Sequence, residues 1–384
     1  MRYRYSAGKD GKLEKKAIIY TSGEHCINHG DVDGEAISIV RKLKSAGFDT
    51  YIVGGAVRDL ILGKKPKDFD IASSASPARI RRIFRNSRII GKRFRLVHVY
   101  FGQRIFEVST FRSLKDGHTS NTFGTIDEDV LRRDFTLNAL YYDPEQQIVV
   151  DYVGGMKDIS KKQIKPIISL TQIFTDDPVR MIRAVKYAAI AGFTLPLNLK
   201  MKIIHQSNLL AAISPSRLTE EILKIINSDK AAVIVDFLDK TGLYNYIQPN
   251  ASSLMRKDAV FKKKYLQSMA DLKGENNARG QALGALFRDY LDSLYEWKPA
   301  PVENFKEICK TVRIFVLPMN PPRFELEYAV KKFLTSRGVI IKKTPPKPLV
   351  SEGDDKPKRK RRRKKKITNE ESGMKNEKSG KLKT

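Results

Sequence analysis

Apolar residues follow two different spacings along the first 155 positions, which predicts a mixed region of helices and strands. Between Asp33 and Gly47 they recur at helical intervals, with Asp33 placed to cap the helix and Gly47 to end it. A second capped helix is expected to begin at Ser76 and Pro77. Runs rich in β-branched and aromatic residues predict strands at 51–53, 68–71, 86–101, 105–111 and 141–152.

Beyond residue 155 the apolar pattern is helical almost throughout. Before residue 33 the chain is polar and rich in Lys and Gly, so we expect an irregular basic extension there. The pattern therefore divides the chain into an extension at 1–32, a mixed αβ domain at 33–155, helical domains at 156–228 and 229–344, and a tail at 345–384.

The net charge of +29 on 384 residues favours a polyanionic partner. The tail at 345–384 holds 15 Lys/Arg against 6 Asp/Glu, a net +9, which leaves +20 on the rest. Ten of the eleven residues at 356–366 are Lys or Arg, so we expect a disordered tail that binds RNA phosphates without reading sequence. A membrane surface or an acidic protein patch is the alternative. The candidate RNA-binding residues are Lys358, Arg359, Lys360, Arg361, Arg362 and Arg363.

The cysteine content favours a reducing compartment. Cys26 and Cys309 are the only cysteines, which excludes a disulfide framework in practice. No apolar run approaches the length of a membrane span, and the polar start does not resemble a signal peptide. We therefore expect a cytoplasmic protein without a transmembrane segment.

A glycine pair at Gly54 and Gly55 follows the strand at 51–53 and precedes a helical pattern. Two glycines allow a sharp turn and a close approach of the backbone to a ligand. Free N–H groups at the start of the helix favour phosphate. Arg58 lies one turn further on and is a candidate ligand for triphosphate oxygens.

Three carboxylates follow this turn. Asp68 and Asp70 are two residues apart, so on a strand both project from one face. Like charges beside a core strand call for a cation, and hard oxygen ligands suit Mg²⁺ that shares its shell with substrate phosphates. Glu107 is the single acid in an apolar strand and could complete the site, or could form a salt bridge with Arg104 or Arg112.

Two further stretches combine carboxylates with hydrogen-bond donors. Residues 131–140 fit a helix that places Asp134 and Asn138 side by side, suited to a ribose hydroxyl, although a helix cap or local salt bridge would also explain them. The preceding segment, 113–129, is expected to be a mobile loop. The other stretch opens a long helix.

In that helix Thr175 is the expected cap, and Asp176 and Asp177 lie in the first turn, where the helix dipole favours acids. Arg180 lies three and four residues further on, so the three side chains can form a face suited to the edge of a nucleobase.

Together these motifs resemble the class II branch of the DNA polymerase β-type nucleotidyltransferases, which contains bacterial poly(A) polymerases and tRNA CCA-adding enzymes. The matching stretches are 54–59, 68–70, 107–112, 132–138 and 176–180. The resemblance implies an α+β fold with a nucleotidyltransferase head at 33–155, an all-α neck that recognises the base at 156–228, and an all-α body that binds RNA at 229–344. Asp176 departs from the Glu usual in the family.

The resemblance also implies the roles of single residues. Asp68 and Asp70 would bind two Mg²⁺ ions, and Glu107 would be the third catalytic carboxylate. ATP would be the substrate. The implied nucleotide-binding residues are Gly54, Gly55, Arg58, Arg133, Asp134, Asn138, Asp177 and Arg180.

Within the family, segments 91–99 and 64–70 and the basic tail resemble the poly(A) polymerase form, whereas many CCA-adding enzymes carry a short His-Gly-Thr in the first segment. We therefore expect template-independent addition of AMP from ATP to the 3′ ends of mRNA or other RNA. CCA or A addition to tRNA is the alternative. A non-catalytic RNA-binding protein of the same fold is disfavoured by the intact carboxylates. RNA-decay or RNA-chaperone proteins are candidate further partners.

Overall fold

The computed structural model describes residues 2–7, 13–91, 96–113, 122–272, 279–298, 301–302 and 304–341. Its contacts group residues 1–342 into one unit and 343–384 into a second. The basic tail at 345–384, with its candidate RNA-binding residues, lies outside the described residues. So do residues 92–95 of the segment at 91–99, and residues 114–121 of the expected loop at 113–129. The last four residues of that segment are not a loop, because they lie in the helix α5 (Ile126–Leu131).

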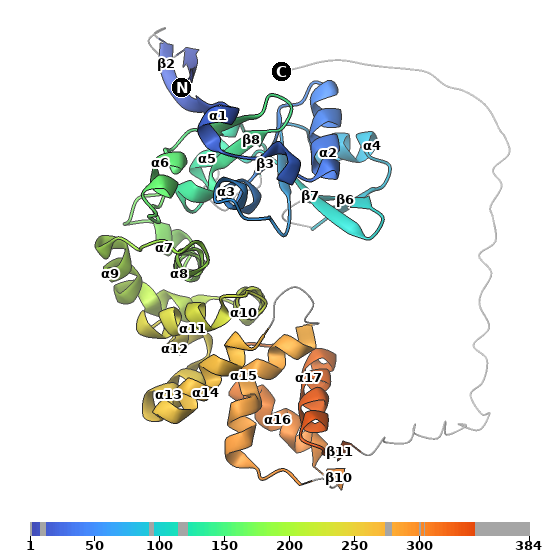
Figure 1. Cartoon of the computed structure of the whole chain (residues 1–384), viewed down its shortest axis with the longest axis vertical. Coiled ribbons are helices and arrows are strands. Elements are labelled where there is room, and N and C mark those ends of the chain that lie inside the picture. Colours follow the sequence, from blue (N-terminus) through green and yellow to red (C-terminus); the bar gives the residue numbers. More distant parts are fainter. Residues whose placement is uncertain are drawn as a thin grey trace, which may run out of the picture. The chain divides into compact units, whose positions relative to one another are not determined.

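A nine-stranded mixed sheet organises the first 155 residues (Figure 1). The strand order is β1-β2-β9-β8-β3-β4-β7-β6-β5. Neighbours run antiparallel except β4 and β7, which are parallel. The bounds are β1 Arg2–Ala7, β2 Leu13–Tyr20, β3 Thr50–Val53, β4 Asp70–Ser73, β5 Ser87–Ile90, β6 Leu96–Phe101, β7 Arg104–Thr110, β8 Leu140–Asp143 and β9 Ile148–Asp151.

Residues 1–32 are not the irregular extension that their composition predicted. The strands β1 and β2 pair with each other, and β2 also pairs with β9 through Ile18 and Asp151. Ala17 is buried, and α1 (Ser22–His25) and the 3₁₀ turn η1 (His29–Asp31) follow the hairpin. The prediction was wrong because strand pairing uses backbone groups, which polar side chains facing solvent do not reveal.

Helices cover the sheet as the spacing of apolar residues predicted. Asp33 caps α2 (Gly34–Ser45) by accepting hydrogen bonds from two backbone N–H groups. Ser76 caps α4 (Pro77–Ile83). These two helices share one core cluster with the inner face of β6, whereas α5 (Ile126–Leu131) packs in a second cluster with residues from the opposite face of β3 and β4. α3 (Gly55–Ile61) begins at the glycine pair.

The chain beyond β9 is helical, as expected, apart from the short pair β10 (Pro301–Val302) and β11 (Ile340–Ile341). The bounds are α6 Gly155–Ser160, α7 Ile173–Asp176, α8 Val179–Ala191, α9 Leu197–Gln206, η3 Ser207–Ala212, α10 Pro215–Ile226, α11 Ala231–Lys240, α12 Tyr244–Ile247, α13 Pro249–Lys257, α14 Ala259–Ala270, α15 Arg279–Leu294, α16 Phe305–Phe315 and α17 Arg323–Ser336. The predicted α+β fold, a mixed head followed by helices, is confirmed.

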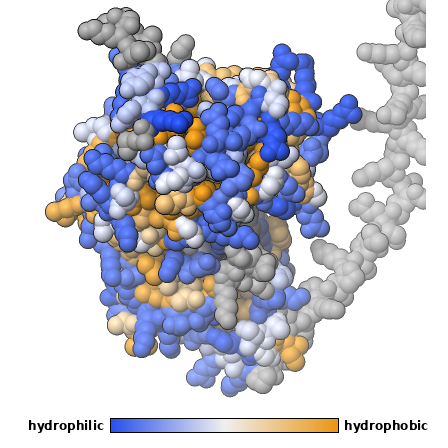
Figure 2. All heavy atoms as spheres, turned by 45° about the horizontal axis from the view of Figure 1, so that its top comes forward, coloured by the Kyte–Doolittle hydropathy of each residue, from blue (hydrophilic) through white to orange (hydrophobic). Residues whose placement is uncertain are grey.

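Hydrophilic side chains cover most of the face shown in Figure 2, with smaller apolar patches between them. Within the described ranges, no helix combines the length and the apolar character that crossing a membrane requires. The buried apolar residues instead form the two clusters that hold the head and the helices together.

Candidate active site

The glycine turn lies directly beside Asp70 and Arg133. Gly54 has φ 74° and ψ −134°, a conformation open essentially to glycine alone. A Cβ on Gly54 would lie 3.8 Å from Asp70 Oδ2 and 3.7 Å from Arg133 Nη1. The turn therefore lies beside a carboxylate and a guanidinium. The sequence predicted the carboxylate but not the guanidinium.

Asp70 and Asp68 are both exposed, whereas Phe69 between them is buried. Strand β4 begins only at Asp70, so Asp68 precedes the strand rather than lying on it as expected. The alternation of exposed and buried positions nevertheless continues through this turn. Val53, the last residue of β3, pairs with Asp70 and leads directly to Gly54.

Glu107 is level with Asp70 on the neighbouring strand. In the parallel pairing of β4 with β7, Ile71 is opposite Val108, which places the residues just before them side by side. Glu107 Oε1 lies 3.4 Å from His98 Nε2. The expected alternative of a salt bridge to Arg104 is wrong, since Arg104 pairs with Asp33 and Glu35.

The electrostatics of Asp70 favour a cation beside it. The residue is exposed, yet protein atoms surround most of its carboxyl. This desolvation, followed by the nearby carboxylate of Glu107, raises the pKa of Asp70 to about 6. Asp68 acts in the same direction, and the charges of Arg133 and Lys224 oppose it. A cation at this position would relieve the repulsion.

The donor set suits a divalent ion that also binds substrate. Among the residues that the structure describes, no three His, Cys, Asp or Glu side chains are close enough to form a complete metal site. The oxygens of Asp70 and Asp68 are the hard ligands that Mg²⁺ prefers, and Mg²⁺ commonly takes only one or two carboxylates, with phosphates and water completing its shell. Asp68 and Asp70 therefore suit a Mg²⁺ ion whose remaining ligands are substrate phosphates and water.

Arg133 connects this turn to the helix before it. The guanidinium donates to Tyr141 Oη at 3.0 Å, to the Asn138 carbonyl at 3.0 Å and to Asp129 Oδ2 at 3.1 Å. Burial would lower the pKa of Arg133, but the groups of Tyr141 and Asp129 outweigh it and raise the pKa. Arg133 is therefore a fixed positive charge beside Asp70. Its partners Asp129 and Tyr141 were not predicted from the sequence.

Asp134 and Asn138 lie side by side as predicted, although the helix predicted at 131–140 is wrong. Asn138 Nδ2 donates to Asp134 Oδ1 at 3.2 Å. Between Leu131, which ends α5, and Leu140, which begins β8, the chain forms only the 3₁₀ turn η2 (Thr136–Asn138). The reason is a distant strand-like contact: Phe135 forms a β-bridge with Pro166.

Arg58 is buried and already hydrogen-bonded. Its Nη1 donates to Asn138 Oδ1 at 2.9 Å, and its Nε donates to Asp59 Oδ1 at 2.8 Å. Its guanidinium also lies 5.3 Å from the ring centroid of Tyr187 on α8. In this structure Arg58 orients Asn138, and direct contact with a triphosphate stays a prediction.

The predicted face of Asp176, Asp177 and Arg180 is built differently. Instead of one helix capped by Thr175, α7 ends at Asp176 and α8 begins at Val179. Asp177 breaks the helix with an extended backbone and pairs with Arg217 at 2.6 Å. Arg180 is buried and donates to the carbonyls of Ile173 at 3.2 Å and Arg132 at 3.5 Å.

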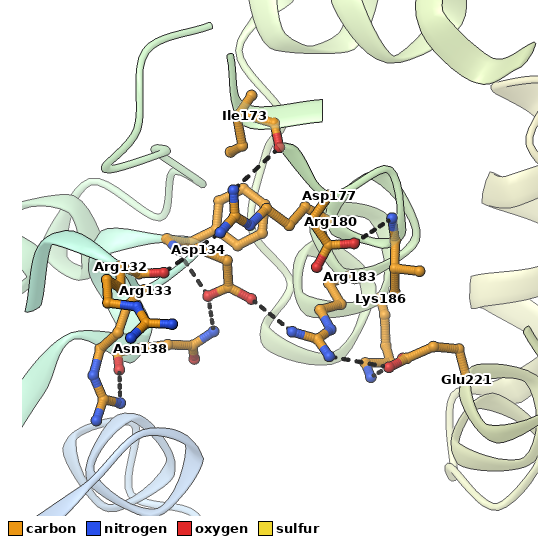
Figure 3. Close-up of polar contacts among 12 residues, drawn as sticks. Arg132, Arg133, Asp134, Asn138, Ile173, Asp177, Arg180, Arg183, Lys186 and Glu221 are labelled. Atoms are coloured by element: carbon orange, nitrogen blue, oxygen red, sulfur yellow. Dashed lines mark hydrogen bonds and ion pairs between the residues drawn. The ribbon is translucent and has the colours of Figure 1, made fainter. Parts of the chain in front are cut away.

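An ion network built on two buried carboxylates, which the sequence did not predict, joins the head to α8 and α10 (Figure 3). Arg183 Nη1 lies 3.8 Å from Asp134 Oδ2, and its Nη2 lies 3.3 Å from Glu221 Oε1. Glu221 also pairs with Lys186 at 3.2 Å and Lys224 at 3.7 Å. A signal was available, because Glu221 falls on the apolar stripe of α10, where an acid needs partners.

Comparison with known proteins identifies the class. The family described as "Poly A polymerase head domain" matches residues 50–165. The family described as "Probable RNA and SrmB- binding site of polymerase A" matches residues 192–255. With the mixed head, the glycine turn and the adjacent carboxylates, these matches establish that the chain belongs to the class II nucleotidyltransferases.

Two kinds of curated relative lie within that class. Poly(A) polymerase I of Escherichia coli O6:H1 is 43% identical over 221 residues, 53% of this chain and 48% of the relative. A CCA-adding enzyme of Geobacillus kaustophilus is 36% identical over 236 residues, 59% of this chain and 58% of the relative. The chain thus spans about half the length of the curated relatives it matches.

Solved structures share the fold over a longer range. The crystal structure of the Bacillus stearothermophilus CCA-adding enzyme in complex with CTP has a TM-score of 0.55 and 27% identity, covering 79% of this chain and 82% of that one. A Thermotoga maritima CCA-adding enzyme complexed with tRNA has a TM-score of 0.52 at 18% identity, covering 83% of this chain and 85% of that one, which supports the fold alone.

Proposed function

We propose that this protein is a template-independent RNA nucleotidyltransferase that adds AMP from ATP to RNA 3′ ends. The observation that carries the proposal is the level pairing of Asp70 with Glu107 on parallel strands, directly beside the Gly54 turn. Identity of 43% to a poly(A) polymerase I, against 36% to a CCA-adding enzyme, supports AMP addition over CCA addition.

The side chains of this chain would bind and orient the reactants. Gly54 and Gly55 would receive the triphosphate, because they lead into the start of α3, where the first N–H groups of a helix have no partner within it. Asp134 and Asn138 would hold the ribose. The base would lie near Asp177 and Arg180, whose positions are fixed by Arg217 and by backbone carbonyls.

Asp68 and Asp70 would hold Mg²⁺, with Glu107 as the third carboxylate. Two such ions, when bound, supply a lower pKa for the RNA 3′-hydroxyl and charge stabilisation for the departing pyrophosphate. Arg133 would keep a positive charge beside Asp70, and the buried network around Glu221 would keep Lys224 near the same carboxylate. Positioning and charge account for most of the catalysis in such transfers.

The test measures incorporation of labelled ATP or CTP into a generic RNA and into a tRNA shortened at its 3′ end. We expect AMP on both RNAs and little CMP on either. CMP followed by AMP on the shortened tRNA alone would establish CCA addition instead. Asp70→Ala should abolish transfer and retain RNA binding, whereas Asp229→Ala, an exposed acid outside the site, should retain both.

Absence of transfer by the unaltered protein with either nucleotide, with RNA binding intact, would favour a non-catalytic RNA-binding protein. Activity retained by Asp70→Ala would refute the proposed site.

A further inference from the structure

Four strands contribute one residue each to a row that leads away from the carboxylates. Asp70 on β4 is level with Glu107 on β7, Glu107 is opposite His98 on β6, and His98 is opposite Arg88 on β5. Residues opposite each other in a sheet share a face. With strands about 4.8 Å apart, Arg88 starts about 14 Å from Asp70, at the edge of the sheet.

A hollow of about 650 Å³ opens at this edge. Tyr100 connects it to the row, because Tyr100 lies two residues beyond His98 on the same face of β6, with ring centroids 6.4 Å apart. The polar side chains that line the hollow come from the end of α4, the following turn, β5 and β6: Arg81, Arg85, Asn86, Ser87, Arg88 and Tyr100.

The charge of this edge is uncompensated. Residues 71–90, which include α4 and β5, contain five arginines and no Asp or Glu. Within the described part of the chain, no carboxylate forms an ion pair with Arg81, Arg85 or Arg88. Arg81 is held in place by donating to the Arg85 carbonyl at 2.8 Å. Exposed arginines are ordinarily scattered or paired, so three that surround one hollow indicate an anionic ligand.

We propose that this edge, formed by α4, β5 and β6, binds the phosphate backbone of RNA upstream of its 3′ end. The inference rests on the proposed function, which places the RNA 3′-hydroxyl at Asp70 and Glu107. The preceding nucleotides then pass His98, and their phosphates reach Arg88 and Arg85. The Tyr100 ring offers a face on which a base can stack without its edge being read.

Two ligands could bind at this edge: RNA, or an extended protein segment that pairs with the edge strand β5. RNA is favoured because the row of residues that starts at Arg88 leads to the carboxylates of Glu107 and Asp70. A strand added to β5 would be satisfied by backbone hydrogen bonds and would not need three arginines. Contacts between arginine and phosphate are indifferent to sequence, so this edge would suit an enzyme that extends many different RNAs.

The test uses the full chain carrying Arg85→Gln and Arg88→Gln together. The matched control is Arg79→Gln with Arg82→Gln, which removes the same charge from exposed positions of α4 that do not line the hollow. Binding of an RNA of roughly twenty nucleotides is measured by fluorescence anisotropy in EDTA, across a salt series. AMP addition is measured on the same RNA and on a dinucleotide.

We expect the site variant to weaken binding of the long RNA on the order of tenfold, and to flatten the dependence of log K on log salt by about 1.4, at about 0.7 per lost phosphate contact. KM for the long RNA should rise with kcat little changed, and KM for the dinucleotide should not move. The control should match the unaltered protein.

An unchanged salt slope, an equal effect in the control, or an equal rise in KM for the dinucleotide would overturn the proposal. Capture of an extended peptide at β5 without any loss of RNA binding in the site variant would overturn it in favour of a protein partner. Because the anisotropy measurement needs no turnover, it tests this edge even if AMP addition fails.

Discussion

The guanidinium of Arg183 bridges the Asp134 carboxylate of the head and the Glu221 carboxylate of α10, at 3.8 Å and 3.3 Å. Both carboxylates are buried. Burial alone would raise the pKa of Glu221, but the charges of Lys186, Arg183 and Lys224 outweigh it and hold the pKa below its usual value. One buried acid therefore neutralises cations that come from two helices.

Glu221→Gln should destabilise the protein by about 3 kcal/mol, because Lys186 is left buried without its counter-charge. Since the folded pKa of Glu221 is lowered, its contribution is present above its ordinary pKa and is lost as pH falls through the folded value. Urea unfolding at pH 7 and near pH 4 measures both effects. Glu220→Gln, an exposed neighbour, is the control, and equal destabilisation by the two variants would contradict the role of the network.

Asp70→Asn should stabilise the protein at neutral pH in the absence of divalent ions, by about 1 kcal/mol or less because solvent screens an exposed group. The pKa of Asp70 is raised to about 6, so the folded state takes up a proton near pH 6 that the unfolded chain binds only in more acid solution. The advantage of the variant should therefore shrink as pH falls below 6.

Thermal unfolding from pH 8 to pH 5 in EDTA checks this, and added Mg²⁺ should raise the Tm of the unaltered protein more than that of the variant. A difference in stability that does not change with pH would rule out the assigned charge repulsion.

Gly54→Ala should cost roughly 1–3 kcal/mol, because alanine cannot adopt φ 74° and ψ −134° without strain. The turn would also move relative to Asp70 and Arg133. The rate of nucleotide transfer should therefore fall even at temperatures where the variant stays folded. Gly34→Ala is the control, since it begins α2 with no atom within 4 Å of the new Cβ. Equal behaviour of the two variants in Tm and in activity would show that the turn is unstrained.

Deletion of residues 345–384 should weaken binding to RNA of any sequence and flatten its salt dependence, because ten of the eleven residues at 356–366 are Lys or Arg. The rate of AMP addition at saturating RNA should change little. A variant in which a neutral segment of equal length replaces the tail is the control. It distinguishes the effect of removing the charge from the effect of shortening the chain. If the salt dependence of RNA binding did not change, the tail would not bind RNA.

Local features were predicted well from the sequence. Gly54, Asp70 and the caps Asp33 and Ser76 depend on neighbours a few residues away, so spacing alone placed them. Glu107 was a candidate because an acid in an apolar strand is anomalous, and its role as a third catalytic carboxylate stays a prediction. The structure shows in addition that Glu107 is level with Asp70 on the neighbouring strand and pairs with His98.

Features that depend on distant partners were missed. The helix expected at 131–140 is replaced by a strand-like contact of Phe135 with Pro166, and Thr136 N–H donates to the Lys165 carbonyl at 2.9 Å. Helical spacing cannot reveal such a competitor. Arg183 and Glu221 are likewise 38 residues apart, and only packing of α8 and α10 brings them together.

Arg58 connects the head to α8. Its guanidinium holds the Asn138 amide on one side and lies 5.3 Å from the Tyr187 ring centroid of α8 on the other. One guanidinium therefore contacts both the Asn138 amide of the head and the Tyr187 ring of α8, so a change at either contact acts on the other through Arg58.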